Sequence, residues 1–103
     1  MYKDIISYQL AEGVTEKHLL SVASDIIENW MSKQAGFVCW EIHNNASADK
    51  DNSYTDIVYW KSEQDAKNAE KEMINIPNAA DWFSCYKEGS INSQNLHQVG
   101  AFK

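Results

Sequence analysis

One carboxylic acid and several aromatic residues are spaced so that they could take part in proton transfer. Residues 53–60 are rich in β-branched and aromatic side chains, which is typical of a strand. Side chains alternate along a strand, so Trp60 shares one face with Val58, Asp56 and Tyr54. An acid held against aromatic walls has a raised pKa because it is desolvated, and such an acid can act as a general base on an activated aromatic compound.

A phenol is expected on the same side of the sheet. Residues 4–10 alternate as a strand whose one face carries Ile6, Tyr8 and Leu10. If this face meets the same helices, Tyr8 can stabilise the anion that a base produces. The candidate catalytic residues are therefore Asp56 and Tyr8. The candidate substrate-binding residues are the surrounding aromatics Trp60, Trp40, Trp82 and Phe83.

A plainer interpretation competes with this one. Acids at the start of strands are commonly solvated, so the sequence alone favours Asp56 in water at the open end of its strand. In the same interpretation Trp30 and Trp40 are core residues that fill space. Trp60 is evenly balanced between a core residue and a pocket wall.

Capping signals delimit the expected helices. Thr15 is a plausible N-cap for a helix with a wide apolar stripe, and Gly36 ends that helix as a C-cap or a turn residue. Ser62 caps a second helix, with Asp65 at the capping-box position, and Pro77 cannot continue it. The remaining expected elements are a strand at 37–43, a mobile hairpin loop at 44–52, a short helical piece at about 78–86 and a final edge strand within 90–102.

The order strand, helix, strand, strand, helix, strand predicts one α+β domain over residues 1–103. It is the ferredoxin-like arrangement, with a four-stranded antiparallel sheet and two helices on one face. The bare face is too apolar to remain wet, which predicts a homodimer; the alternative is a monomer with an open apolar sheet. Its expected residues are Ile5, Ser7, Phe37, Cys39, Ile57 and Tyr59.

Composition excludes several classes of protein. The net charge of -6 leaves no cationic surface for nucleic acid or for an anionic membrane. No stretch approaches a transmembrane span, and Lys3 and Asp4 interrupt the only apolar run that could begin a signal peptide. Cys39 and Cys85 suit a reducing cytoplasm, and each is expected to be a buried thiol.

The sequence predicts no cofactor. The three histidines lie on different expected elements without the spacing of metal ligands, and there is no glycine-rich phosphate loop. The purified protein is therefore expected to be colourless and free of metal.

Three short motifs resemble a known group of proteins. They are Gly13 after the first strand, Gly36-Phe37 at the second strand, and residues 60–63, Trp-Lys-Ser-Glu, before the second helix. Together they resemble the dimeric α+β barrel superfamily over about residues 3–100, and they are most similar to its antibiotic-biosynthesis-monooxygenase-like branch. The resemblance implies two sheets paired face to face, and a pocket between sheet and helices. Some members oxidise polycyclic aromatic compounds with molecular oxygen without metal or flavin, and others degrade haem.

The haem-degrading branch does not fit this chain. Trp60 matches that branch's pocket tryptophan, but the branch also needs an asparagine where Ile6 stands and a histidine near Asp81. Aspartate is a poor replacement for a haem-binding imidazole. Two functions remain: a cofactor-independent monooxygenase acting on an aromatic substrate, or a non-catalytic dimeric module that binds a small apolar ligand or a protein. The volume of the chamber between helices and sheet distinguishes them.

Overall fold

The computed structural model describes residues 1–46 and 52–103, and most of the predicted hairpin loop at 44–52 lies outside them. The strands are β1 (Tyr2–Gln9), β2 (Phe37–Asn44), β3 (Ser53–Trp60) and β4 (Asn92–His97). The helices are α1 (Glu16–Asn29), α2 (Glu63–Glu72) and the short α3 (Ala79–Phe83), with 3-10 turns at Met31–Lys33 and Met73–Asn75. This order confirms the predicted ferredoxin-like α+β fold.

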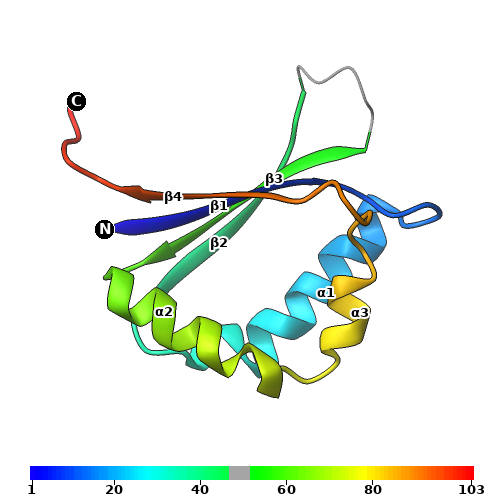
Figure 1. Cartoon of the computed structure of the whole chain (residues 1–103), viewed down its shortest axis with the longest axis horizontal. Helices are drawn as coiled ribbons and strands as arrows, with labels where there is room; N and C mark the ends of the chain where they lie inside the picture. The colour runs from blue at the N-terminus through cyan, green and yellow to red at the C-terminus, as the bar shows by residue number, and fades with distance from the viewer. Residues whose placement is uncertain (47–51) are drawn as a thin grey trace.

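The strands form one antiparallel sheet in the order β2-β3-β1-β4. All three helices lie on one face of it, with the sheet above and the helices below in Figure 1. In the register of β1 and β3, Tyr8 pairs with Tyr54, Ile6 with Asp56 and Tyr2 with Trp60. The alternation predicted for both strands is therefore confirmed. Their helix-facing residues form the sheet side of the space between the sheet and the helices.

Side-chain caps begin both long helices where the sequence predicts them. The Thr15 hydroxyl oxygen accepts from the His18 backbone N–H at 3.1 Å, and the Ser62 hydroxyl oxygen accepts from the Asp65 N–H at 3.1 Å. Gly36 is a turn residue and not a helix cap, because α1 ends at Asn29 and a 3-10 turn intervenes. Within the described residues, no helix is long and apolar enough to cross a bilayer.

A β-bulge in β2 corrects one part of the predicted pattern. The register shifts between Phe37 and Cys39, so Phe37 pairs with Trp60 and its ring contacts the indole edge-to-face at 5.7 Å. Phe37 therefore belongs to the helix-facing side and not to the bare face, whereas Val38 is 41% exposed. Beyond the bulge, Trp40 and Ile42 face the helices as predicted.

The open face of the sheet carries Ile5, Ile57 and Tyr59, all partly exposed, as the alternation predicts. Cys39 lies there too and is exposed, so the expectation of two buried thiols holds only for Cys85. The final strand, β4, is a sheet edge as predicted, and the tail after it extends away from the body (Figure 1).

Gly36 should be the less replaceable of two glycines with nearly equal backbone conformation. Gly36 has φ +79° and Gly13 has φ +81°, a region that costs an ordinary residue about 1–2 kcal/mol. A Cβ at Gly36 would overlap the Asp65 side chain, whereas a Cβ at Gly13 would meet nothing within 4 Å. We expect Gly36→Ala to lower the free energy of unfolding by clearly more than Gly13→Ala, as measured by urea denaturation. Equal losses would contradict this packing.

Candidate active site

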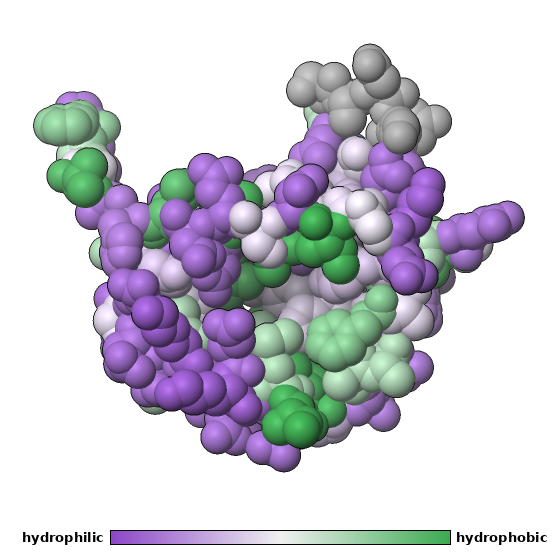
Figure 2. Space-filling model, in the orientation of Figure 1, coloured by the Kyte–Doolittle hydropathy of each residue, from purple (hydrophilic) through white to green (hydrophobic). Residues whose placement is uncertain are grey.

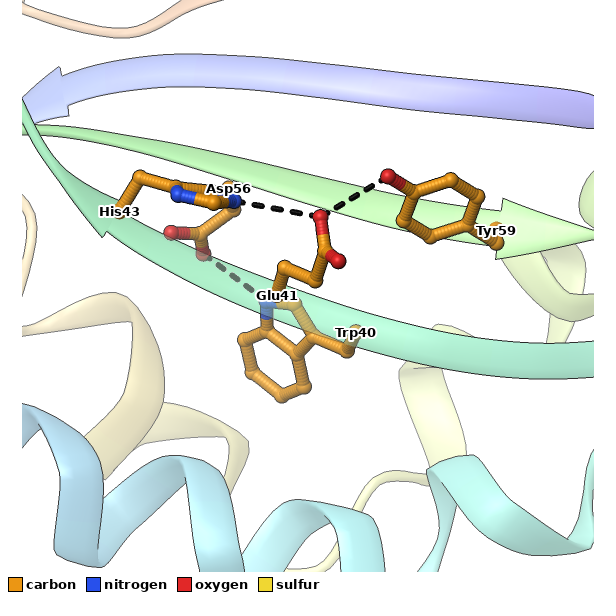
Figure 3. Close-up of polar contacts among 5 residues, drawn as sticks. All are labelled: Trp40, Glu41, His43, Asp56 and Tyr59. Atoms are coloured by element: carbon orange, nitrogen blue, oxygen red, sulfur yellow. Dashed lines mark hydrogen bonds and ion pairs between the residues drawn. The ribbon is translucent and has the colours of Figure 1, made fainter. Parts of the chain in front are cut away.

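A buried carboxylate lies at the centre of the helix-facing side of the sheet. Asp56 is only 1% exposed. The Tyr8 hydroxyl donates to its Oδ1 at 2.7 Å, and the Trp40 indole Nε1–H donates to its Oδ2 at 3.1 Å. These contacts join β1, β2 and β3 through one carboxyl group, and Figure 3 shows the bond from Trp40. The interpretation of Asp56 as a solvated strand-end acid is therefore wrong.

Burial makes Asp56 a proton acceptor that titrates near neutral pH. Desolvation raises the pKa of its carboxyl group from 3.8 to about 6, although the hydrogen bonds from Tyr8 and Trp40 act in the opposite direction. The charge of His43, on the other side of the sheet, also lowers the pKa of Asp56, by a smaller amount. A carboxylate with this pKa is poised to accept a proton at physiological pH.

A cavity of about 360 Å³ lies between the sheet and the helices and includes Asp56 in its wall. Figure 2 shows the surface hollowed between these two layers. Three of the four predicted substrate-binding residues line it: Trp40, Trp60 and Trp82. Trp30 and Met31 complete the aromatic and apolar wall on the helical side, so Trp30 and Trp40 are not only core filler. The volume lies within the range of small-molecule pockets.

Phe83 and Tyr8 are placed outside this wall. Phe83 is 48% exposed and stacks on Trp82 at 5.3 Å between ring centroids, so it supports a wall residue from outside. Tyr8 is buried and reaches the cavity only through Asp56. Burial and the Asp56 charge raise the pKa of the Tyr8 phenol far above its usual value. Tyr8 is therefore a neutral donor to Asp56 and does not line this cavity.

Sequence reasoning missed a second acid in the same wall. Asp4 lines the cavity, and it is half-buried on the helix-facing side of β1. The signal was present, since Asp4 precedes Ile6 and Tyr8 at the same period of two. Burial raises the pKa of the Asp4 carboxyl group, a hydrogen-bonding interaction with the Trp60 indole that falls outside normal geometry lowers it, and the charge of Glu70 raises it further.

Among the described residues, Trp60 Nε1 is the one buried side-chain nitrogen or oxygen atom that lacks a hydrogen-bond partner at normal geometry. Its Nε1–H is shielded from solvent and has no acceptor at normal geometry, although it is close enough to Asp4 to influence that carboxyl group. A buried donor without a partner costs about 1–3 kcal/mol. Such a cost is often found where a site is built for a ligand.

The side chains that commonly bind metal ions lie apart from one another among the residues that the structure describes. No group of three or more histidine, cysteine, aspartate or glutamate side chains is arranged there to hold an ion. His43 binds Glu41 at 3.2 Å on the open face, and His97 binds Glu63 at 3.3 Å, so these two histidines belong to separate surface contacts.

Comparisons with known proteins agree on the fold. No protein-family model and no curated protein sequence matches the chain. SnoaB, a cofactor-independent oxygenase from Streptomyces nogalater, is 17% identical, with a TM-score of 0.75 over 97% of this chain and 94% of its own. The monooxygenase from the gene ActVA-Orf6 of Streptomyces coelicolor, solved with nanaomycin D, is 16% identical, with a TM-score of 0.67 over 99% and 90%.

Two further similar structures, from Nitrosomonas europaea and Chloroflexus aurantiacus, carry the name antibiotic biosynthesis monooxygenase. The fold is thus the ferredoxin-like fold of antibiotic-biosynthesis-monooxygenase-like proteins, as the sequence motifs suggest. At identities below a fifth, this likeness shows the fold alone.

The raised pKa of Asp56 should appear in the stability of the protein. A pKa of 3.8 in the unfolded chain and about 6 in the folded protein means that folding favours the protonated form. The stability contributed by this proton is full below about pH 4, declines as the pH rises, and is lost above about pH 6. The total change is about 3 kcal/mol.

We therefore expect the stability difference between wild type and Asp56→Asn to shift against the wild type by about that amount between pH 4 and pH 7. Urea denaturation at half-unit steps of pH measures it. Glu28→Gln, an exposed change on α1 that also removes one negative charge, is the control and should show no such shift. A pH-independent difference for Asp56→Asn would mean that this carboxyl group titrates normally.

Proposed function

We propose that this protein is a cofactor-independent monooxygenase that acts on an aromatic substrate between the sheet and the helices. One observation carries the proposal: a buried carboxylate with a pKa near 6 stands in the wall of an aromatic cavity of about 360 Å³. A base of this strength is what proton abstraction from an electron-rich aromatic compound requires. The likeness in fold to oxygenases that need no cofactor supports the same reaction class.

The residues of the site have three roles: one is the base, two position it, and the indoles bind the substrate. Asp56 is the general base, and Tyr8 and Trp40 position its carboxylate and partly stabilise its charge. The indoles of Trp40, Trp60 and Trp82 provide flat apolar surfaces for an aromatic ring system. Tyr8 acts through Asp56 and is a positioning residue.

The proposed oxidation consumes molecular oxygen and needs no added reductant. Asp56 takes a proton from an anthrone-type methylene group, and the resulting anion gives electrons to molecular oxygen. A carbon–oxygen bond forms, the methylene carbon becomes a carbonyl, and the second oxygen atom leaves as water with the two hydrogens that the carbon has lost. The protein supplies the base and orients the substrate against the indole walls of the cavity.

Removal of the base should abolish most of the activity. We expect wild type to consume oxygen with 1,8-dihydroxyanthrone above the rate without protein, and Asp56→Asn to be slower by roughly 100-fold or more. The wild-type rate should rise with pH through about 6, because only the ionised carboxylate accepts a proton. Oxygen-electrode rates from pH 5 to 8, with Glu28→Gln as the control, measure both. Full activity in Asp56→Asn would refute the assignment.

The same experiment tests the alternative function. A wild type that binds the anthrone but consumes no oxygen beyond the background rate would be the non-catalytic ligand-binding module. The cavity volume and its aromatic lining favour a ligand of some kind in either case.

We infer further that two copies pair through the open face of the sheet. The face presents Ile5, Ile57 and Tyr59, and Leu96 of β4 lies beside them with 37% of its surface exposed. Exposed apolar side chains gathered on one face of a sheet favour a partner there.

The polar groups on this face already have partners. Glu41 accepts from the Tyr59 hydroxyl at 2.8 Å and contacts His43 at 3.2 Å, as Figure 3 shows. The pKa of the Glu41 carboxyl group is held low by the hydrogen bond from His43 and then by that from Tyr59. The ammonium group of Lys3 lies 5.2 Å from the Tyr59 ring centroid. A second sheet could therefore cover the face without leaving these charges unpaired.

Sedimentation should show a dimer at micromolar concentration, and a charge at the centre of the open face should break it. We expect Ile57→Lys to be monomeric, because an unpaired ammonium would be buried in the interface. Ile74→Lys is the matched control, since Ile74 is 88% exposed on the helical side and its replacement should leave the dimer intact. A wild-type species of 11.8 kDa, the mass of one chain, would contradict the pairing.

A further inference from the structure

The cavity has a second polar end, away from Asp56. Asp4 of β1 is paired with Val58 of β3, so it is the diagonal neighbour of both Asp56 and Trp60 on the helix-facing side. Diagonal neighbours across an antiparallel pair are about 7–8 Å apart. The two acids therefore stand at separate points of one wall, with an apolar side chain between them.

One oxygen of Asp4 is already bonded. With its amide turned to satisfy its neighbours, Asn95 of β4 donates to Asp4 Oδ1 at 3.0 Å and accepts from the Tyr2 hydroxyl at 3.2 Å. These contacts fix the carboxylate at the edge of the cavity. In the described part of the chain the contact at normal hydrogen-bond geometry is to Oδ1, and a weaker hydrogen-bonding interaction with the Trp60 indole lowers the pKa of the carboxyl group. A carboxylate has about four acceptor positions, so Asp4 keeps capacity to accept from a ligand.

The indole of Trp60 supplies an unused donor beside it. Only 3% of the Trp60 surface is exposed. Its Nε1–H has no hydrogen-bond acceptor at normal geometry in the part of the chain described. Indole nitrogen can only donate and an ionised carboxylate can only accept. The two groups are near enough to influence each other but are not joined at hydrogen-bond geometry.

We propose that Asp4 and Trp60 form a binding site for one hydroxyl group of an aromatic ligand, with Nε1–H of Trp60 donating to the hydroxyl oxygen and the Asp4 carboxylate accepting its proton. The inference rests on the proposed function in so far as the cavity takes an aromatic substrate. Because Nε1 is shielded from solvent in this structure, the indole and the carboxylate must part slightly to admit the group.

A hydroxyl group is the ligand chemistry that satisfies both partners. A ketone or an ether oxygen can accept from Trp60 but has no proton for Asp4, and it would leave the carboxylate facing a second acceptor. A ligand carboxylate would stand beside Asp4 and Glu70, both of which line the cavity, and Lys67 in the same lining is already paired with Glu63 at 3.2 Å. The substrate class is therefore a fused aromatic compound with two oxygen functions, one directed to Asp56 and one, a hydroxyl, directed to Asp4.

Two probes that differ only at one oxygen test this site. 1,5-Dihydroxynaphthalene carries both hydroxyl groups, and 5-methoxy-1-naphthol keeps one for Asp56 but cannot donate a second proton. Dissociation constants come from calorimetry under anaerobic conditions, so that no reaction intervenes. We expect wild type to bind the dihydroxy probe about tenfold more tightly or better, since a hydrogen bond to a charged acceptor is lost with the ether.

Variants of Asp4 and Trp60 test whether these residues cause the preference for the dihydroxy probe. Asp4→Leu removes the acceptor, so the ratio of the two dissociation constants should fall to about one, whereas Asp4→Asn, which nearly keeps the volume and retains a carbonyl acceptor, should be intermediate. Trp60→Phe removes the N–H donor, which can reach the oxygen of either probe, so it should weaken the binding of both probes and leave their ratio largely unchanged. Glu28→Gln on α1 should leave it unchanged. Urea denaturation confirms that each variant is folded, and Asp4→Asn remains as the test if Asp4→Leu does not fold.

Each outcome decides the inference. The inference is supported by a ratio that falls in Asp4→Leu but not in Glu28→Gln, together with weaker binding of both probes by Trp60→Phe. A ratio of one in wild type, an unchanged ratio in both Asp4 variants, or no binding of the dihydroxy probe overturns it. Failure of the proposed reaction is seen separately, as binding with this selectivity but no oxygen consumption with the anthrone.

Discussion

The buried carboxylate of Asp56 is the constraint on which the rest of the structure depends. A carboxylate 1% exposed is unfavourable unless donors reach it, and here the donors come from two different strands. Tyr8 on β1 and Trp40 on β2 must both stand on the same face as Asp56 on β3. A slip of one residue in either pairing would turn the acid or a donor to the opposite face. The polar contact therefore specifies the register of the three strands that form the cavity floor.

The cavity exists because the two long helices present side chains of different size. α1 places Leu19 and Ile26 against the sheet, and both are fully buried. α2 places Ala66 and Ala69 there, and both line the cavity. Small side chains on one helix leave space that large ones would fill, and the indoles of neighbouring elements line that space without closing it. The helical layer is thus a packed core at one end and a pocket at the other.

Much of this fold could be predicted from the sequence because local signals agreed. Thr15 and Ser62 cap the helices, and the period of two in β1 and β3 placed Tyr8 and Asp56 correctly. The bulge at Phe37 could not be predicted, since alternation alone carries no sign of an inserted residue. The burial of Asp56 was misjudged for another reason: it depends on two donors 48 and 16 residues away in the chain, and a single strand reveals neither.

The same reasoning explains why Asp4 was overlooked while Asp56 was found. Asp4 lies close to the N-terminal end of its strand, where an acid is usually solvated, and only the arrival of β4 with Asn95 encloses it. In both cases a charged group stands where a hydrophobic residue would stabilise the sheet more. Two acids and an unpaired indole N–H in one wall are departures from the best-packed core, and they are concentrated around one cavity. Deviations of this kind that cluster in space are typical of ligand-binding sites, because a bound ligand can supply hydrogen-bond partners that the folded chain lacks.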